Sequence, residues 1–179
     1  MEPIGPLMME HRLIERMLQL VQKEIQEAEA KQRVDGAFVD AVVDFIRWYA
    51  DRTHHGKEEA ILFRDAAQKE LSSQDRALLN ELIADHNFGR RTVTQIAEAK
   101  GQYLQGSEEA LKTLSEKLRT LIDFYHQHIQ KEDKFFFPAA MIYFSEQEQK
   151  AMLEEFWQAD RKMIHTKYGF IVGEYEKQK

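Results

Sequence analysis

The chain has 179 residues, of which 43% are hydrophobic and 31% are charged, with only three Pro and eight Gly. This composition is typical of one helical globular domain that is long enough to bury a core. The absence of Cys excludes disulfides and thiolate metal sites, and a net charge of −6 without a Lys/Arg-rich run argues against a nucleic-acid surface.

The first predicted helix begins near Pro3 and Pro6. Its buried face repeats at steps of three and four residues, through Leu7, His11, Ile14, Leu18, Val21, Ile25 and Ala28. Asp35 precedes Gly36 and can cap the second helix. The inward face of that helix is expected to hold Val39, Val43, Ile46, Ala50, His54, Glu58 and Ile61 or Leu62.

Two adjacent histidines compete for the inward position of this second helix. One turn before His54 stands the apolar Ala50. One turn before His55 stands the charged Asp51. We therefore expect His54 to point inward with Glu58, and His55 to face the polar flank with Glu59.

Three further helices follow. The run from Ser72 to Asp75 is a cap signal for a helix with the stripe Leu79, Leu82, His86, Gly89, Val93 and Ile96. Gly101 to Gly106 breaks the pattern, and Ser107 opens a helix whose inward face is Leu111, Leu114, Leu118, Leu121, Tyr125, His128, Glu132 and Phe135. Ser145 to Glu148 has the spacing of a capping box, and an apolar side with Phe156 and Trp157 follows it.

Short breaks between long amphipathic helices predict antiparallel neighbours. We expect an all-α fold, an up-down-up-down four-helix bundle over about residues 4–140 with a fifth helix over about 145–178, in a single domain spanning 1–179. The start of the chain does not resemble a signal peptide, and no apolar run reaches the roughly 18 residues of a membrane span. A cytoplasmic protein with no membrane partner is expected.

One ten-residue segment occurs twice. His54 to Phe63 reads H-H-G-K-E-E-A-I-L-F, and 74 residues later His128 to Phe137 reads H-I-Q-K-E-D-K-F-F-F. Both follow the frame H-x-x-K-E-[ED]-x-x-x-F. A lone His stands upstream of each copy, His11 by 43 residues and His86 by 42. This indicates a duplicated unit of lone His, helix crossing and His-x-x-x-Glu.

The duplicated residues have the character of metal ligands. In each H-x-x-x-E segment the His and Glu lie one turn apart, so they lie side by side on one face. With the two lone His, four imidazoles and two carboxylates converge inside the bundle, where unpaired polar groups are costly and carboxylates repel one another. Two divalent cations satisfy all six groups, and each Glu can bridge them. The predicted ligands are His11, His54, Glu58, His86, His128 and Glu132.

The ligand types also favour particular metals. Imidazole and carboxylate without thiolate are typical of iron or manganese, with zinc as an alternative. Six side chains leave two ions short of full coordination. A small molecule such as dioxygen, water or nitric oxide can therefore bind at the open positions.

At these residues the sequence resembles the hemerythrin-like (HHE cation-binding) family over nearly the whole chain. The resemblance is carried by E-H at 10–11, H-H-G-K-E-E-x-x-L-F at 54–63, D-H at 85–86 and H-x-x-x-E-D-x-x-x-F-P at 128–138. It implies an up-down four-helix bundle around a non-haem diiron centre. By position, it implies the four His as terminal ligands, with Glu58 and Glu132 as bridges between two iron ions.

The chain departs from this family at one position. The oxygen-carrying hemerythrins have a second His one turn after the His of the third helix, where this chain has Arg90. The resemblance therefore does not imply reversible oxygen carriage. His165, on the fifth helix, is a candidate replacement ligand, although a supporting or surface role suits its place at the edge of the apolar face better. The ligand spacing is closer to the family's iron-centre repair proteins, but the Cys of their extra segment has no counterpart here.

The sequence thus predicts a diiron protein that binds or senses dioxygen, nitric oxide or peroxide, or that serves iron homeostasis under stress. The alternative is a diiron enzyme of peroxidase-like or nitric-oxide-reducing, iron-centre repair type. A ferritin-like oxidase is less favoured, because it uses E-x-x-H and only D-x-x-H occurs here, at Asp51 and Asp123. A His-Asp phosphohydrolase is disfavoured because Asp85-His86 has the reverse order. A metal-free helical interaction module would leave the duplicated ligands unexplained.

Overall fold

The structure, a computed structural model, describes residues 2–176, apart from the side chains of residues 108, 164–166 and 168–176. Its regular elements are all helical, and no strand occurs in the described range, so the predicted all-α class is confirmed. The elements are α1 (Ile4–Lys31), α2 (Gly36–Phe45), η1 (Ile46–His55), η2 (Glu58–Phe63), α3 (Arg64–Ala67), α4 (Ser73–Leu104), α5 (Glu108–Lys131), η3 (Glu132–Phe136), α6 (Phe137–Met141) and α7 (Glu146–Glu176). The three elements marked η are π-helical.

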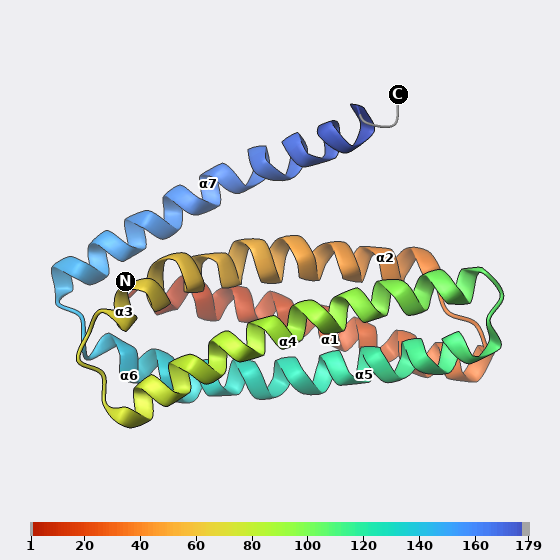
Figure 1. Cartoon of the computed structure of the whole chain (residues 1–179), viewed down its shortest axis with the longest axis horizontal. Helices are drawn as coiled ribbons and strands as arrows, with labels where there is room; N and C mark the ends of the chain where they lie inside the picture. The colour runs from red at the N-terminus through yellow and green to blue at the C-terminus, as the bar shows by residue number, and fades with distance from the viewer. Residues whose placement is uncertain (1, 177–179) are drawn as a thin grey trace.

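Four long helical rods lie side by side, and α7 runs at an angle to them (Figure 1). The first rod is α1, and the second joins α2, η1, η2 and α3. The third rod is α4, and the fourth joins α5, η3 and α6. In the bundle α4 packs against α5 and α2, and α1 packs against α5, while α7 contacts η1 and η2.

Helix starts carry the caps that the sequence predicts. The Asp35 carboxylate accepts hydrogen bonds from the backbone N–H groups of Ala37 and Phe38 at 2.9 and 3.1 Å. Ser72 Oγ accepts from the N–H of Asp75 at 3.1 Å. Ser145 and Glu148 exchange both bonds of a capping box. Ser107, by contrast, precedes α5 without a side-chain cap bond.

The core consists of two hydrophobic clusters with a buried polar layer between them. In α1, Leu7 belongs to one cluster and Ile14 to the other, and the buried His11 lies between them. The other three rods likewise pass from one cluster to the other at His54 and Glu58, at His86, and at His128 and Glu132. Each rod therefore places its predicted ligands at the same level of the bundle.

The π-helical segments shift the register of the inward face. We predicted that Phe135 faces the core, but its side chain is 59% exposed, and Phe136 is buried instead. Phe135 follows Glu132 by three residues, whereas the wider turn of η3 brings the fourth residue back to the same face. In α7, Phe156 is buried as expected, but Trp157 is 44% exposed.

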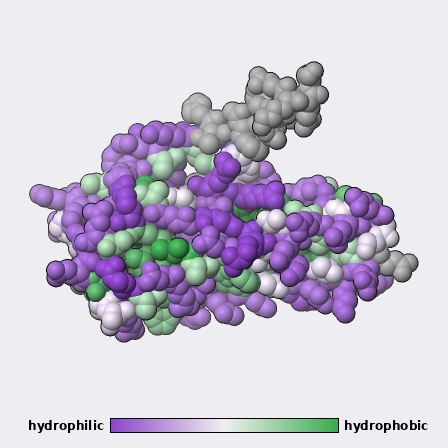
Figure 2. Space-filling view, viewed as in Figure 1, coloured by the Kyte–Doolittle hydropathy of each residue, from purple (hydrophilic) through white to green (hydrophobic). Residues whose placement is uncertain are grey.

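The surface in the view of Figure 2 is largely hydrophilic, with a hydrophobic patch towards the left end. This fits the high share of charged residues in the sequence. None of the helices in the described part of the chain combines the length and the apolar character that crossing a membrane requires.

Candidate metal centre

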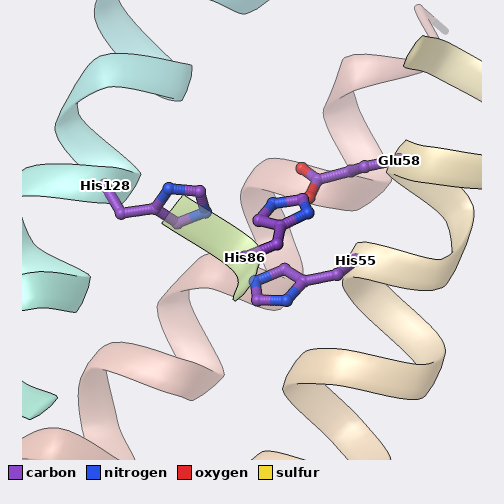
Figure 3. Close-up of side chains that lie close together, drawn as sticks. All are labelled: His55, Glu58, His86 and His128. Atoms are coloured by element: carbon purple, nitrogen blue, oxygen red, sulfur yellow. The ribbon is translucent and has the colours of Figure 1, made fainter. Parts of the chain in front are cut away.

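The polar layer brings together seven side chains, each at most 1% exposed: His11, His54, His55, Glu58, His86, His128 and Glu132. They form two groups in which one ligand atom of each residue lies within 4.8 Å of the others. One group is His11, His54, Glu58 and Glu132, and the other is His55, Glu58, His86 and His128. In Figure 3 the second group converges on one space from three rods. All six predicted ligands are therefore in the layer, and Glu58 belongs to both groups.

The two carboxylates extend from one group to the other. Glu58 Oε1 lies 3.5 Å from His54 Nε2, and its Oε2 lies 3.3 Å from His86 Nε2. Glu132 Oε2 lies 3.2 Å from His11 Nε2, and its Oε1 lies 3.3 Å from His128 Nε2. Each carboxylate thus presents one oxygen to each side, which is the geometry that a bridging ligand needs.

The prediction for His55 was wrong. It was expected on the polar flank, but its side chain is 1% exposed and its ring stacks on that of His86, with centroids 3.8 Å apart and an angle of 9° between the planes. The reason is the π-helical segment η1, in which a turn takes in about one extra residue. His54 and His55 consequently both face inward above the buried Ala50.

The buried polar atoms of this layer fit cations. Among the described residues, eight buried nitrogen and oxygen atoms make no hydrogen bond, and all belong to this centre: both ring nitrogens of His55, both carboxylate oxygens of Glu58 and Glu132, and Nε2 of His86 and His128. Within the described part of the chain, the carboxylate oxygens and the nitrogens of His86 and His128 have only one another and the inner nitrogens of His11 and His54 as neighbours of opposite charge, at 3.2–3.5 Å. Buried polar groups without partners cost roughly 1–3 kcal/mol each. Divalent cations would satisfy the four carboxylate oxygens and one nitrogen of each ring together.

The outer nitrogens of the histidines point to the same conclusion. Four imidazoles each donate a hydrogen bond from Nδ1 to a carboxylate: His11 to Asp133 (2.7 Å), His54 to Glu10 (2.9 Å), His86 to Glu59 (2.7 Å) and His128 to Asp85 (3.2 Å). We call these four acidic groups the outer carboxylates. Carboxylates orient metal-binding imidazoles in this way and leave the Nε2 lone pair for the metal. His11 Nε2 and His54 Nε2 lie only 2.8 Å apart, so a proton or a cation must lie between their lone pairs.

A cation completes each of these four pairs. Arg12 binds Asp133, Lys57 binds Glu10, Arg90 binds Glu59, and Lys131 binds Asp85. These cations help to keep three of the outer carboxylates ionised. Burial alone raises the pKa values of Glu10, Glu59 and Asp85, but the contacts with the imidazoles and the cations outweigh burial and lower them.

The duplicated frame is explained by these contacts. The acidic residue before each lone His, Glu10 or Asp85, binds the His of the H-x-x-x-E segment in the same unit. The acidic residue after Glu58 or Glu132 binds the lone His of the other unit, as Glu59 does to His86 and Asp133 does to His11. The last residue of the frame also contacts the lone His of the other unit, since Phe63 stacks on His86 and Phe137 stacks on His11.

The buried imidazoles differ in charge when no metal is bound. Burial lowers the pKa of His11, but contacts with Asp133 and Glu132 have the larger, opposite effect, so the pKa rises to about 10. The pKa of His86 rises to about 11, because Glu132, Glu58 and Glu59 outweigh the effect of burial. Burial and the neighbouring imidazoles push the pKa of His55 well below its ordinary value. His55 is therefore neutral, which is the form that binds a metal.

The remaining candidates are Arg90 and His165. Arg90, at the position of the missing family His, pairs with Asp51 and Glu59 outside the polar layer. His165 lies in α7, but its side chain is outside the described residues. The sequence reasoning missed His55 and the outer carboxylates. The repeat contained the signal for both, because residue 55 aligns with the apolar Ile129, and the outer carboxylates occupy matching positions in the two units.

Comparison with known proteins agrees with this geometry. Residues 2–140 match the family model described as the hemerythrin HHE cation-binding domain. No curated protein sequence matches the chain.

Proposed function

The chain belongs to the hemerythrin HHE cation-binding domain family, and we propose that it is a single hemerythrin-like domain, an up-down-up-down four-helix bundle with an added helix, that holds two iron ions and binds a small ligand such as dioxygen, nitric oxide or peroxide. The observation that supports this most strongly is the set of eight buried atoms within one polar layer that make no hydrogen bond. Manganese and zinc are the alternative ions, and we favour iron because an imidazole and carboxylate set with open positions is typical of non-haem iron.

The donors available to the two ions are unequal. His55, His86 and His128 would hold one ion, and His11 and His54 the other, with Glu58 and Glu132 as bridges. That gives five donor atoms on one side and four on the other. A small ligand has more room at the ion held by His11 and His54. The iron pair, when bound, would supply this ligand site and the electrons for redox chemistry.

The protein's own part in this function is to orient the donors and exclude bulk water. The outer carboxylates hold four imidazoles with Nε2 inward, and the two hydrophobic clusters seal the layer at both ends. Phe63 and Phe137 stack on the two lone His and fix their ring planes. Such a preorganised, dry site supports binding or sensing of a ligand in iron homeostasis or a stress response.

A cavity supplies a route for a small ligand. It has a volume of about 620 Å³, lies between η1 and α4, and reaches His55 and Tyr125. Arg90 and Asp51 line it as an ion pair, and Val93 and Thr94 contribute its α4 wall. A diatomic molecule is far smaller than this space, so the cavity can conduct it from the surface to the His55 side of the polar layer, from which the ion held by His11 and His54 lies across the two carboxylates.

Substituting Thr94 with Trp should narrow this route without disturbing the core, because Thr94 is exposed. We expect nitric oxide to bind and to leave the iron-loaded protein several-fold more slowly, with an unchanged Kd, since a barrier on the route affects both rates alike. Stopped-flow spectroscopy measures both rates. The matched control is Thr120→Trp, which alters a threonine with the same hydroxyl-to-backbone hydrogen bond on another helix. Equal rates in all three proteins would contradict the proposed route.

The metal claim is tested by metal analysis and ultraviolet-visible spectra of protein that is reconstituted with ferrous iron without air and then exposed to it. Two irons per chain, with an absorption change that reverses on deoxygenation, is the expected result for a dioxygen-binding protein. Sustained turnover of peroxide or nitric oxide with a reductant would favour the enzyme alternative. Protein that binds no iron, manganese or zinc would refute the proposal.

A further inference from the structure

The two lysines of the duplicated frame have the same role but different surroundings. Lys57 binds Glu10, and Lys131 binds Asp85, so each supports the carboxylate that orients a predicted ligand His. Lys131 is 25% exposed and also contacts Glu81 at 2.7 Å. Lys57 is only 1% exposed, and its second partner is Asp160 of α7, at 2.7 Å. The added helix therefore covers one of the two related positions.

The burial of Lys57 depends on α7. Phe156 is fully buried, and the Lys57 ammonium lies 6.0 Å from its ring centroid. Asp160 follows Phe156 by one helical turn, so the same face of α7 supplies both the apolar cover and the counter-charge. A buried ammonium is costly unless it is fully paired. Without Asp160, Lys57 would have Glu10 as its one anionic partner among the described residues.

We propose that Asp160 is a positioning residue through which α7 and the ion held by His11 and His54 stabilise one another. The connection runs from Asp160 to Lys57, then to Glu10, which orients His54. Binding effects of this kind are reciprocal, so a helix that strengthens metal binding is itself held more firmly when the metal is bound. The inference rests on the proposed metal function.

The location of α7 allows this coupling to link metal binding to the surface of the molecule. The helix begins at Glu146, whereas the family match ends at residue 140. It is thus an addition to the family domain, placed against one side of the centre. The state of that side is transmitted to a helix at the surface, where a change in its docking can alter what α7 contacts.

The test compares two charge-removing variants at matched positions, Asp160→Asn and Glu81→Gln. Ferrous iron is titrated without air into metal-free protein, in competition with a chelator. For Asp160→Asn we expect the affinity for one of the two ions to fall by about 3- to 10-fold, less than the loss of a partner that contacts the ligand directly, because Asp160 acts through Lys57 and Glu10. For Glu81→Gln we expect changes in affinity below about twofold, because Lys131, which is 25% exposed, keeps its contact with Asp85 and can be hydrated. Asp160→Glu should restore binding.

Hydrogen exchange of α7 amides between residues 150 and 163 provides the reciprocal measurement. Iron should slow this exchange in the wild-type protein and much less in Asp160→Asn. The coupling would be overturned if Asp160→Asn lowered the affinity for both ions equally. It would also be overturned if Asp160→Asn and Glu81→Gln had equal effects on iron affinity, or if neither had an effect. Should the wild-type protein bind no metal, the proposed function fails. If metal binds to the wild-type protein but the hydrogen-exchange rates of α7 do not change, the coupling fails and the proposed metal function stands.

Discussion

Replacing Glu58 with Gln is expected to abolish binding of the ion pair. Glu58 is fully buried and presents one oxygen to each group of histidines, so no other carboxylate except Glu132 can balance both ions. Loss of this charge leaves two cations repelling one another across a single bridge. We expect the affinity for both ions to fall by more than about 100-fold, beyond the effect of removing an orienting partner. Metal analysis after dialysis against a weak chelator measures the loss.

The neighbouring Glu59→Gln variant is the matched control for this experiment. Glu59 orients His86 from the outside and is about one-third exposed. Its loss should lower the affinity for the ion on the His86 side by about 10- to 100-fold and leave the affinity for the other ion unchanged. Two ions bound to Glu58→Gln with affinities within tenfold of the wild type would rule out Glu58 as a bridge.

Replacing His55 with Ile is expected to change the metal-free and metal-loaded proteins in opposite directions. Ile stands at the matching position 129 of the second unit, and it is similar to His in size. In the metal-free protein the change removes two buried nitrogens that make no hydrogen bond, at about 1–3 kcal/mol each, but it also removes the stacking of His55 on His86, so the free energy of unfolding should rise by about 1–3 kcal/mol. In the loaded protein it removes a donor, so one ion should bind more than about 100-fold more weakly.

Thermal melting of the metal-free variant and metal titration give the two readouts. His126→Ile, at an exposed histidine of α5, is the control for loss of an imidazole as such. If His55→Ile destabilises the metal-free protein and leaves both ions bound tightly, His55 is a packing residue and not a ligand.

The sequence predicts the helical class and the inner positions of the six repeated residues, because each H-x-x-x-E pair and each lone His lies on a continuous apolar stripe. It fails at His55 and Phe135 for one shared reason. Both errors follow from counting 3.6 residues per turn, whereas the π-helical turns of η1 and η3 contain more residues. No propensity at Ile46–His55 indicates a π-helix, because that geometry results from the packing of the rods around the buried polar groups.

The outer carboxylates show a different limit. Their matching positions in the two units are visible in the sequence, yet their partners are not. Glu59 contacts a histidine 27 residues away and Asp133 one 122 residues away, and both contacts join the two units. Only the arrangement of the rods in space decides which unit supplies which partner.

These crossed contacts bear on how such a chain can arise. A single unit of two helices would leave its lone His without an outer carboxylate and without its stacked Phe, and would have one buried Glu in place of two. Two identical units related by a two-fold axis would supply all three to each other. A symmetric dimer of helical hairpins is thus the smallest assembly with a complete centre, and the present chain is equivalent to such a dimer joined end to end. The two halves are not identical, because His55 has an apolar counterpart in Ile129, and Lys57 contacts Asp160 of α7 whereas Lys131 contacts Glu81.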